Sequence, residues 1–206
     1  MNRSMCVVTA GALAGALIIA GCGKAKPSAA DSAAPAAAAS ANGGIVYSAA
    51  DVAFMQGMIG HHAQALVMAE MAPTHGASPQ VLTLCKKIDI SQRDEITMMR
   101  QWLADRKQTV PDSTKPMAML MPGMLTPAQL DSLAKSRDTL FDRLFLTFMI
   151  QHHQGALKMV KDLFASTGGG QSPELFRYAS DVDADQRAEI DRMQQMLNTS
   201  SGSRAQ

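Results

Sequence analysis

The sequence predicts an all-α protein, a four-helix bundle made of two repeated helical hairpins. The segment Met58–Met68 returns 91 residues later as Met149–Met159, and each copy carries two adjacent histidines. Residues 78–103 return as residues 172–197, at an offset of 94. The repeated unit is therefore one helical hairpin of about fifty residues, and two antiparallel hairpins that each bury one face form a four-helix bundle.

The start of the chain has the pattern of an export signal. Arg3 precedes an apolar run from Val7 to Ala20, which is too short for a comfortable membrane span and ends in small residues. The sequence Ile-Ala-Gly-Cys22 resembles a lipobox, so we expect residues 1–21 to be a lipoprotein signal peptide and Cys22 to carry the lipid. An ordinary cleaved signal is the alternative. The lipoprotein interpretation predicts an extracytoplasmic protein, in the periplasm or cell envelope, that is anchored to a membrane.

Composition then divides the rest of the chain. Residues 22–45 are mostly Ala, Ser, Pro and Gly, which predicts a disordered tether; the bundle is expected over 46–200 and a disordered tail over 201–206. Beyond Cys22 the chain has one further cysteine, Cys85, which we expect to be a small buried residue and which cannot form an intramolecular disulfide by itself. A net charge of +1 without a basic run argues against nucleic acid as a partner.

The first hairpin is bounded by clear start and stop signals. Ser48 and Asp51 begin a helix that continues to about Met71, where Pro73 and Gly76 break it. His75 lies in that break, and we expect it to be solvated. The Ser-Pro pair at 78–79 begins the second helix, which is expected to end near residue 106.

The second hairpin follows a long connection. Residues 107–125 contain three prolines and a cluster of methionines, so they are expected to form a loop or an extended crossover. Thr126 and Pro127 begin a helical stretch that bends or breaks near Ser136 and continues through the second histidine pair to about Phe164. The Ser-Pro pair at 172–173 begins the last helix.

The residues that could carry chemistry are the paired histidines and the methionines around them. Adjacent histidines are about 100° apart on a helix, so each pair straddles the middle of a buried face. Imidazole and thioether groups form a soft, neutral ligand set that suits Cu(I) better than Cu(II) and disfavours Mg, Ca and Mn. The predicted copper ligands are Met58, His61, His62, Met68, Met149, His152, His153 and Met159, together with Met121 and Met124 of the crossover.

The same residues allow a second interpretation. A methionine stripe at helical spacing also serves as flexible core filler, and the histidines could be core residues hydrogen-bonded to Glu95 and Glu189. The protein would then be a structural or protein-interaction bundle without a metal. If a metal is bound, the two glutamates fit best as partners that orient the imidazoles.

An enzymatic function has less support in the sequence. No Ser-His-Asp arrangement, glycine-rich phosphate loop or pair of catalytic carboxylates is recognisable, and the Glu-x-x-His motif of di-iron bundles does not occur. We therefore expect a binding protein, with a copper-dependent oxidase as a third alternative. Sequestration, tolerance or hand-over of copper are the expected roles. Hand-over would require a copper-trafficking protein as a partner, and the oligomeric state stays open.

Several motifs taken together resemble the domain-of-unknown-function family DUF305, a family of small exported bacterial proteins. The resemblance covers about residues 48–198 and rests on five stretches, namely Asp51-x-x-Phe54-x-x-x-Met58-x-x-His61-His62, Gln92-Arg93-x-Glu95-Ile96, Met121-Pro-Gly-Met124-x-Thr-Pro127, Phe141-Asp-Arg-Leu-Phe145 and Met149-Ile-x-His152-His153. It implies a ferritin-like four-helix bundle. Some members are linked to periplasmic copper binding and copper resistance. By position, the resemblance implies as ligands Met58, His61, His62, Met149, His152 and His153.

Overall fold

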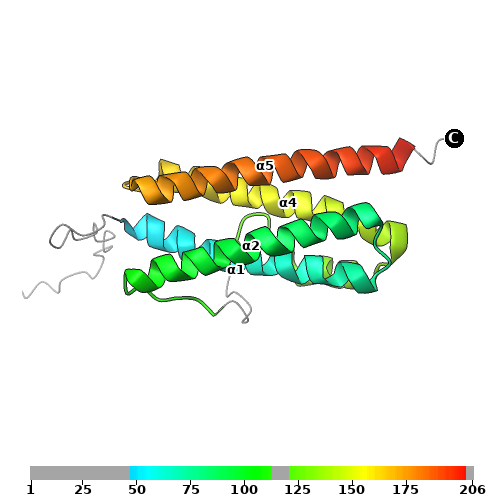
Figure 1. Cartoon of the computed structure of the whole chain (residues 1–206), viewed down its shortest axis with the longest axis horizontal. Coiled ribbons are helices and arrows are strands. Elements are labelled where there is room, and N and C mark those ends of the chain that lie inside the picture. The colour runs from blue at the N-terminus through cyan, green and yellow to red at the C-terminus, as the bar shows by residue number, and fades with distance from the viewer. Residues whose placement is uncertain (1–46, 113–120, 203–206) are drawn as a thin grey trace, which may run out of the picture. The chain divides into compact units, whose positions relative to one another are not determined.

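The computed structural model describes residues 47–112 and 121–202, all within one compact unit. Its helices are α1 (Ala49–Met71), α2 (Pro79–Asp105), α3 (Pro127–Lys135), α4 (Asp138–Ala165) and α5 (Pro173–Gly202), with a short 3-10 turn, η1 (Ala72–Thr74), after α1 (Figure 1). The predicted leader, lipidated Cys22 and tether lie outside the described residues. The last helix extends two residues beyond the predicted end of the bundle at residue 200.

The helices begin where the sequence predicts, and every start except that of α4 has a side chain that accepts from a free backbone amide. The Ser48 side chain accepts from the Asp51 amide, Ser78 from Val81 and Thr126 from Gln129. Proline follows the cap directly at α2, α3 and α5, where its missing N–H leaves no helical bond unmade. At Ser136 the backbone becomes extended, which separates α3 from α4.

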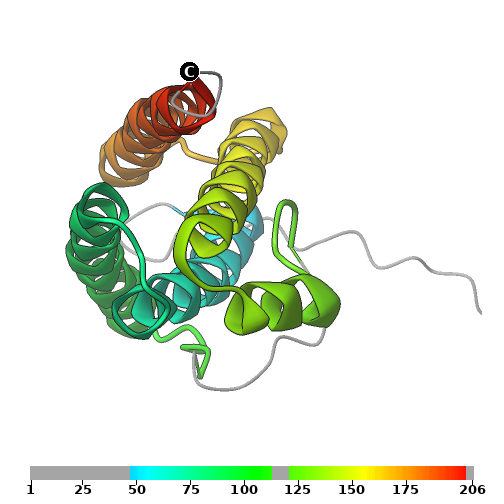
Figure 2. The same cartoon turned by 90° about the vertical axis from the view of Figure 1, so that its right-hand side faces the viewer.

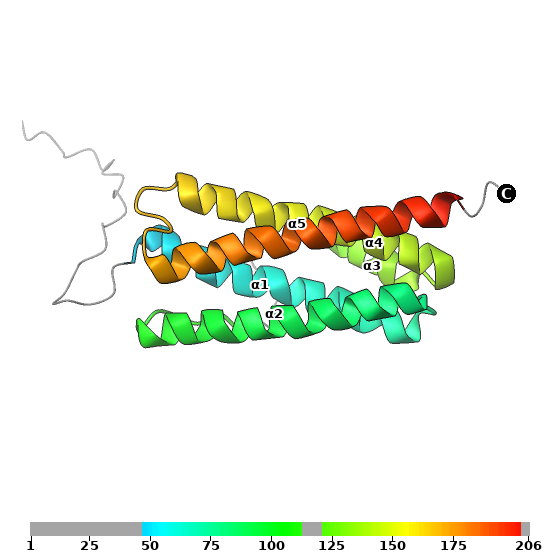
Figure 3. The same ribbon diagram turned by 45° about the horizontal axis from the view of Figure 1, so that its top comes forward.

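The long helices form two antiparallel hairpins, α1 with α2 and α4 with α5, which meet where α1 packs antiparallel to α4 (Figures 2 and 3). The short helix α3 lies beside α1 and α4. Within the described parts of the chain there is no strand, and no helix is both long and apolar enough to cross a membrane. The predicted all-α bundle of two helical hairpins is thereby confirmed.

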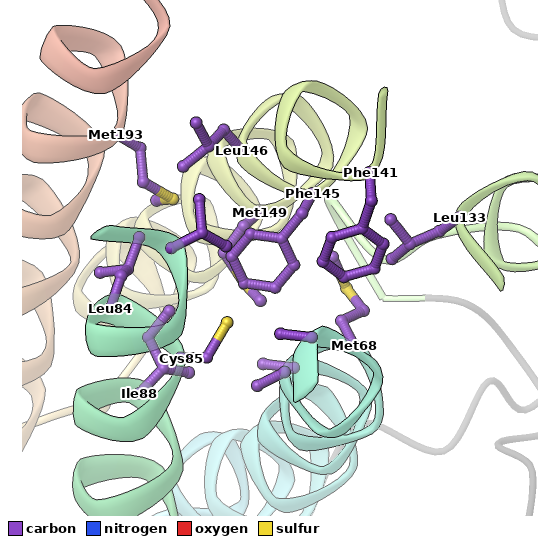
Figure 4. Close-up of a cluster of buried hydrophobic side chains, with 14 of the residues drawn as sticks. Met68, Leu84, Cys85, Ile88, Leu133, Phe141, Phe145, Leu146, Met149 and Met193 are labelled. Atoms are coloured by element: carbon purple, nitrogen blue, oxygen red, sulfur yellow. The ribbon is translucent and has the colours of Figure 1, made fainter. Parts of the chain in front are cut away.

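The hydrophobic core consists of two clusters along the length of the bundle. One joins the second half of α1 to the first half of α4 and includes Met68, Phe141, Phe145 and Met149 (Figure 4). The other joins the first half of α1 to the second half of α4. Cys85 lies in the first cluster, as predicted, and burial, with a smaller effect from Asp142, raises the pKa of its thiol to about 12.

Two matched aspartates fasten each hairpin to the turn of the other. Asp51, which is buried, accepts from the amide of Ser48 at 2.7 Å and from the amide of Gly170, in the turn between α4 and α5, at 2.7 Å. At the equivalent position in the second copy, Asp142 accepts from the amide of Ser78 in the turn between α1 and α2, at 3.1 Å. The duplicated carboxylates therefore hold the two hairpins in register.

We predict that Asp51→Ala lowers the free energy of unfolding by about 2–4 kcal/mol, because it removes an N-cap partner and leaves a buried amide at Gly170 without its acceptor. Urea unfolding followed by circular dichroism measures the change. Asp89→Ala is the matched control: it removes a surface pair with Arg93 and should cost less than about 1 kcal/mol. Equal losses in the two variants would contradict the proposed role of Asp51.

Candidate metal centre

The four paired histidines form a buried polar layer between the two hydrophobic clusters. All four side chains are fully buried. His61 of α1 and His152 of α4 face each other across the contact between the hairpins, with ring centroids 3.8 Å apart and planes inclined at 38°. We call these two residues the inner pair. The duplicated positions thus come together at the point where the two copies meet.

The other two histidines, His62 and His153, point toward the outer helices, and we call them the outer pair. His62 Nε2 lies 2.5 Å from the carboxylate of Glu95 on α2, and His153 Nε2 lies 2.6 Å from that of Glu189 on α5. Because a carboxylate only accepts, each Nε2 carries a hydrogen, and in a neutral imidazole the lone pair is then on Nδ1. Each glutamate therefore orients one imidazole, as the sequence predicts for both of its interpretations.

The inner pair has no such carboxylate. His61 Nε2 donates to the carbonyl oxygen of Pro122 at 3.0 Å, which leaves the lone pair of His61 on Nδ1. The backbone of His61 is near His152, but among the residues that the structure describes neither ring nitrogen of His152 has a partner in hydrogen-bond geometry. Buried polar atoms are usually paired, so these nitrogens are among the exceptions in the described bundle that call for an explanation.

The inner pair is neutral near pH 7. Burial, with a smaller effect from His62, lowers the pKa of His61 to about 3. Burial also lowers the pKa of His152 well below its ordinary value, and the neighbouring His61 and His153 add to the effect. A neutral imidazole with a free lone pair is the form that binds a metal ion, so these two side chains need not lose a proton first.

The methionines lie on both sides of the histidine layer, grouped differently from the sequence expectation. The spacing placed Met58 and Met68 beside the histidines of the same helix, and Met149 and Met159 likewise. In the structure Met58 belongs to one core cluster with Met159, and Met68 belongs to the other with Met149. Antiparallel packing of α1 and α4 causes this exchange, so each side of the layer receives one thioether from each copy.

The end of the crossover, residues 121–125, packs directly over the inner pair. Gly155 permits this contact, since a Cβ there would lie 1.9 Å from the oxygen of Pro122. In the first copy the equivalent residue is Gln64, whose amide group bonds both the N–H and the C=O of Leu125, at 2.7 and 3.0 Å. The sequence motif indicated methionines here, but not the backbone contact to His61.

Two further predicted features have a clear outcome. His75 was expected to be solvated; it is half-buried, and its ring nitrogens lie 2.6 Å from the Met71 carbonyl oxygen and 2.9 Å from that of Ala134, so it links α3 to the end of α1. Within 47–112 and 121–202, no three His, Cys, Asp or Glu side chains come together as a metal-binding group.

Comparison with known proteins identifies the family. The family model described as "Domain of unknown function (DUF305)" matches residues 51–197. The chain belongs to the DUF305 family. The resemblance carried by the sequence motifs is thereby confirmed, and the match includes both histidine pairs and both glutamates. A comparison with curated proteins gives no match.

Solved DUF305 structures share the fold. A DUF305 fragment from Deinococcus radiodurans is 31% identical, with a TM-score of 0.65 over 74% of this chain and 98% of that chain. A Streptomyces coelicolor DUF305 protein, described as a predicted secreted protein, is 27% identical, with a TM-score of 0.65 over 73% and 93%. The Cu(I)-bound form of CopM is 33% identical, with a TM-score of 0.58 over 72% and 96%, and CopM is also solved in Cu(II)-bound and Ag-bound forms.

The depressed pKa values of the inner pair predict acid sensitivity of the metal-free protein. The unfolded chain protonates both imidazoles near pH 6.5, whereas the folded chain keeps them neutral, so unfolding takes up protons. The free energy of unfolding should therefore fall as the pH decreases below about 6.5, by at most about 1.4 kcal/mol per pH unit for each histidine, and the His61 contribution continues toward pH 3. Urea unfolding between pH 7.5 and 5 measures this slope.

Other groups also titrate in this range, so the informative quantity is the difference from a variant without the inner pair. In His61→Phe/His152→Phe the slope should be clearly shallower than in the parent protein. Parallel pH dependences of the two proteins would show that the inner pair does not titrate as described.

Proposed function

We propose that this DUF305 protein binds copper, as Cu(I), at the inner pair and its flanking thioethers, and that it sequesters the ion or hands it over outside the cytoplasm. The observation that carries the proposal is the pair of facing, fully buried imidazoles, His61 and His152, whose free nitrogens have no other evident role. Leaving such atoms unpaired costs about 1–3 kcal/mol each. A ligand that uses the lone pairs would offset that cost.

The donor chemistry of the site fits a soft monovalent ion. His61 and His152 would supply neutral nitrogen ligands, and Met58 with Met159 on one side, and Met68 with Met149 on the other, would supply thioethers. Glu95 and Glu189 pair with the outer histidines and not with the inner pair, so the centre of the layer stays neutral. Hard divalent ions, which prefer carboxylate oxygens, would be disfavoured there.

The outer pair would act mainly through position. The bond from Nε2 to a glutamate sets the tautomer of His62 and His153 and fixes the ring orientation, which is the arrangement found behind many metal-binding histidines. Their Nδ1 atoms are buried without a partner among the described residues, so they could add ligands. Without metal, these same bonds stabilise the bundle.

The relatives support this proposal at the level of the family. CopM is 33% identical and has been solved with Cu(I), Cu(II) and Ag. An extracytoplasmic location is supported by the export signal and by the description of the Streptomyces relative. We propose that a lipid on Cys22 holds the protein to a membrane, that it binds and releases copper without turnover, and that a copper-trafficking protein receives the ion.

The inner pair can be tested with a substitution that keeps a flat aromatic ring, somewhat larger than imidazole, and removes the nitrogens. We predict that His61→Phe/His152→Phe lowers Cu(I) affinity at least tenfold in competition with a Cu(I) chelator. Its metal-free stability should be equal to or above that of the parent, because buried unpaired polar atoms are lost. Unchanged copper affinity would overturn the proposed site.

The outer pair is the matched control in the same experiment. His62→Phe should lower the free energy of unfolding of the metal-free protein by about 1–3 kcal/mol, because Glu95 loses its donor in a half-buried position. If the inner and outer substitutions destabilise the metal-free protein equally, the alternative of purely structural histidines is favoured.

A further inference from the structure

The two copies of the repeat differ at one position beside the inner pair, and the difference creates space in one copy only. Gly57 lies one turn before His61 on α1, whereas Phe148 lies one turn before His152 on α4. The first copy therefore has only a hydrogen atom where the second copy has a phenylalanine ring. Two thioether side chains occupy the surface that this glycine leaves open.

Those side chains are Met121 of the crossover and Met159 of α4. A Cβ added to Gly57 would lie 2.9 Å from the Cε of Met121 and 3.6 Å from its Sδ, and 3.4 Å from the Cε of Met159. Both thioethers thus touch the same small patch of α1. A third sulfur is close by, because the Sδ of Met124 accepts from the amide of Met121 at 3.4 Å.

The three methionines are not equally buried, and a packing role alone does not require one of them to reach the surface. Met124 and Met159 are each 8% exposed, whereas Met121 is half-buried and reaches the surface. The residue after Met121 supplies the carbonyl oxygen that accepts from His61. Met121, which reaches the surface, is therefore the chain neighbour of the residue that contacts the inner pair.

We propose that Met121, Met124 and Met159 form a second metal site, made of thioethers alone, that binds a soft monovalent ion, Cu(I) or Ag(I), between solvent and the inner pair. Thioether sulfur is a neutral, soft ligand, so a site of this kind selects Cu(I) or Ag(I) over Cu(II) and Zn(II). Methionine has three rotatable side-chain bonds. Small rotations of these side chains in the space beside Gly57 can therefore turn the sulfurs toward one ion.

This second site extends the proposed function. It rests on that proposal in one respect only, namely that the ion is passed on to the inner pair. The second copy has Phe148 at the position of Gly57, and there the described end of the crossover passes over Gly155. The duplicated bundle would therefore take up metal from one side. The ion would pass from Met121, at the surface, toward the buried nitrogens of His61 and His152.

Silver titration of the metal-free protein with methyl-labelled methionine tests the site, because Ag(I) is monovalent, soft and redox-silent. Ag(I) should shift the methyl resonances of Met121 and Met159 and leave that of Met71, at the far end of α1, unchanged. Met121→Leu/Met124→Leu, which leaves Met159 beside the inner pair, should bind one equivalent of Ag(I) fewer than the parent with little change in melting temperature, because the exchange preserves volume.

The matched control is Met71→Leu/Met193→Leu, which likewise removes one half-buried and one buried thioether and should keep every equivalent. If Met121→Leu/Met124→Leu binds as many equivalents as the parent with equal affinity, the three methionines are core filler and the proposal is overturned. The variant His61→Phe/His152→Phe separates the two proposals: it should lose the inner site while Ag(I) still shifts the Met121 methyl group.

Discussion

Four imidazoles at the centre of an apolar four-helix core are the constraint on which the rest of the structure depends. A buried polar group is costly unless it is paired, and the bundle treats its two pairs differently. Glu95 and Glu189 reach inward from α2 and α5 to hold His62 and His153, whereas His61 and His152 face each other with nitrogens left free. The clusters on both sides of the layer keep water away from it, and this burial is also what lowers the pKa values of the inner pair.

Duplication accounts for how such a layer can form from one short motif. Antiparallel contact between equivalent helices brings equivalent residues face to face, so a single histidine position becomes a pair at the interface of the hairpins. The aspartates at the starts of α1 and α4 act in the same way, because each binds the turn of the other hairpin. The two copies therefore stabilise each other through the same residues that define the repeat.

The crossover between the hairpins breaks this symmetry, and the break has chemical consequences. The crossover backbone accepts from His61, whereas both ring nitrogens of His152 lack a hydrogen-bond partner, and Met121 of the crossover approaches α1 at Gly57. The two inner histidines are thus equivalent by origin and different in their surroundings. A symmetric layer can hold an ion, whereas an asymmetric one can also distinguish the side from which the ion arrives.

The sequence by itself determined the all-α fold, the helix starts, the two-hairpin repeat and the candidate metal-binding residues. Capping residues and a repeat offset of 91 to 94 residues can both be recognised in the order of the amino acids alone. It also indicated Glu95 and Glu189 as partners of the histidines. Only the tertiary structure decided that His61 meets His152, that Met58 groups with Met159, and that the carbonyl oxygen of Pro122 reaches His61. Spacing places residues on a face of one helix, but helix direction and the path of a long connection, which are set by packing, decide what that face meets.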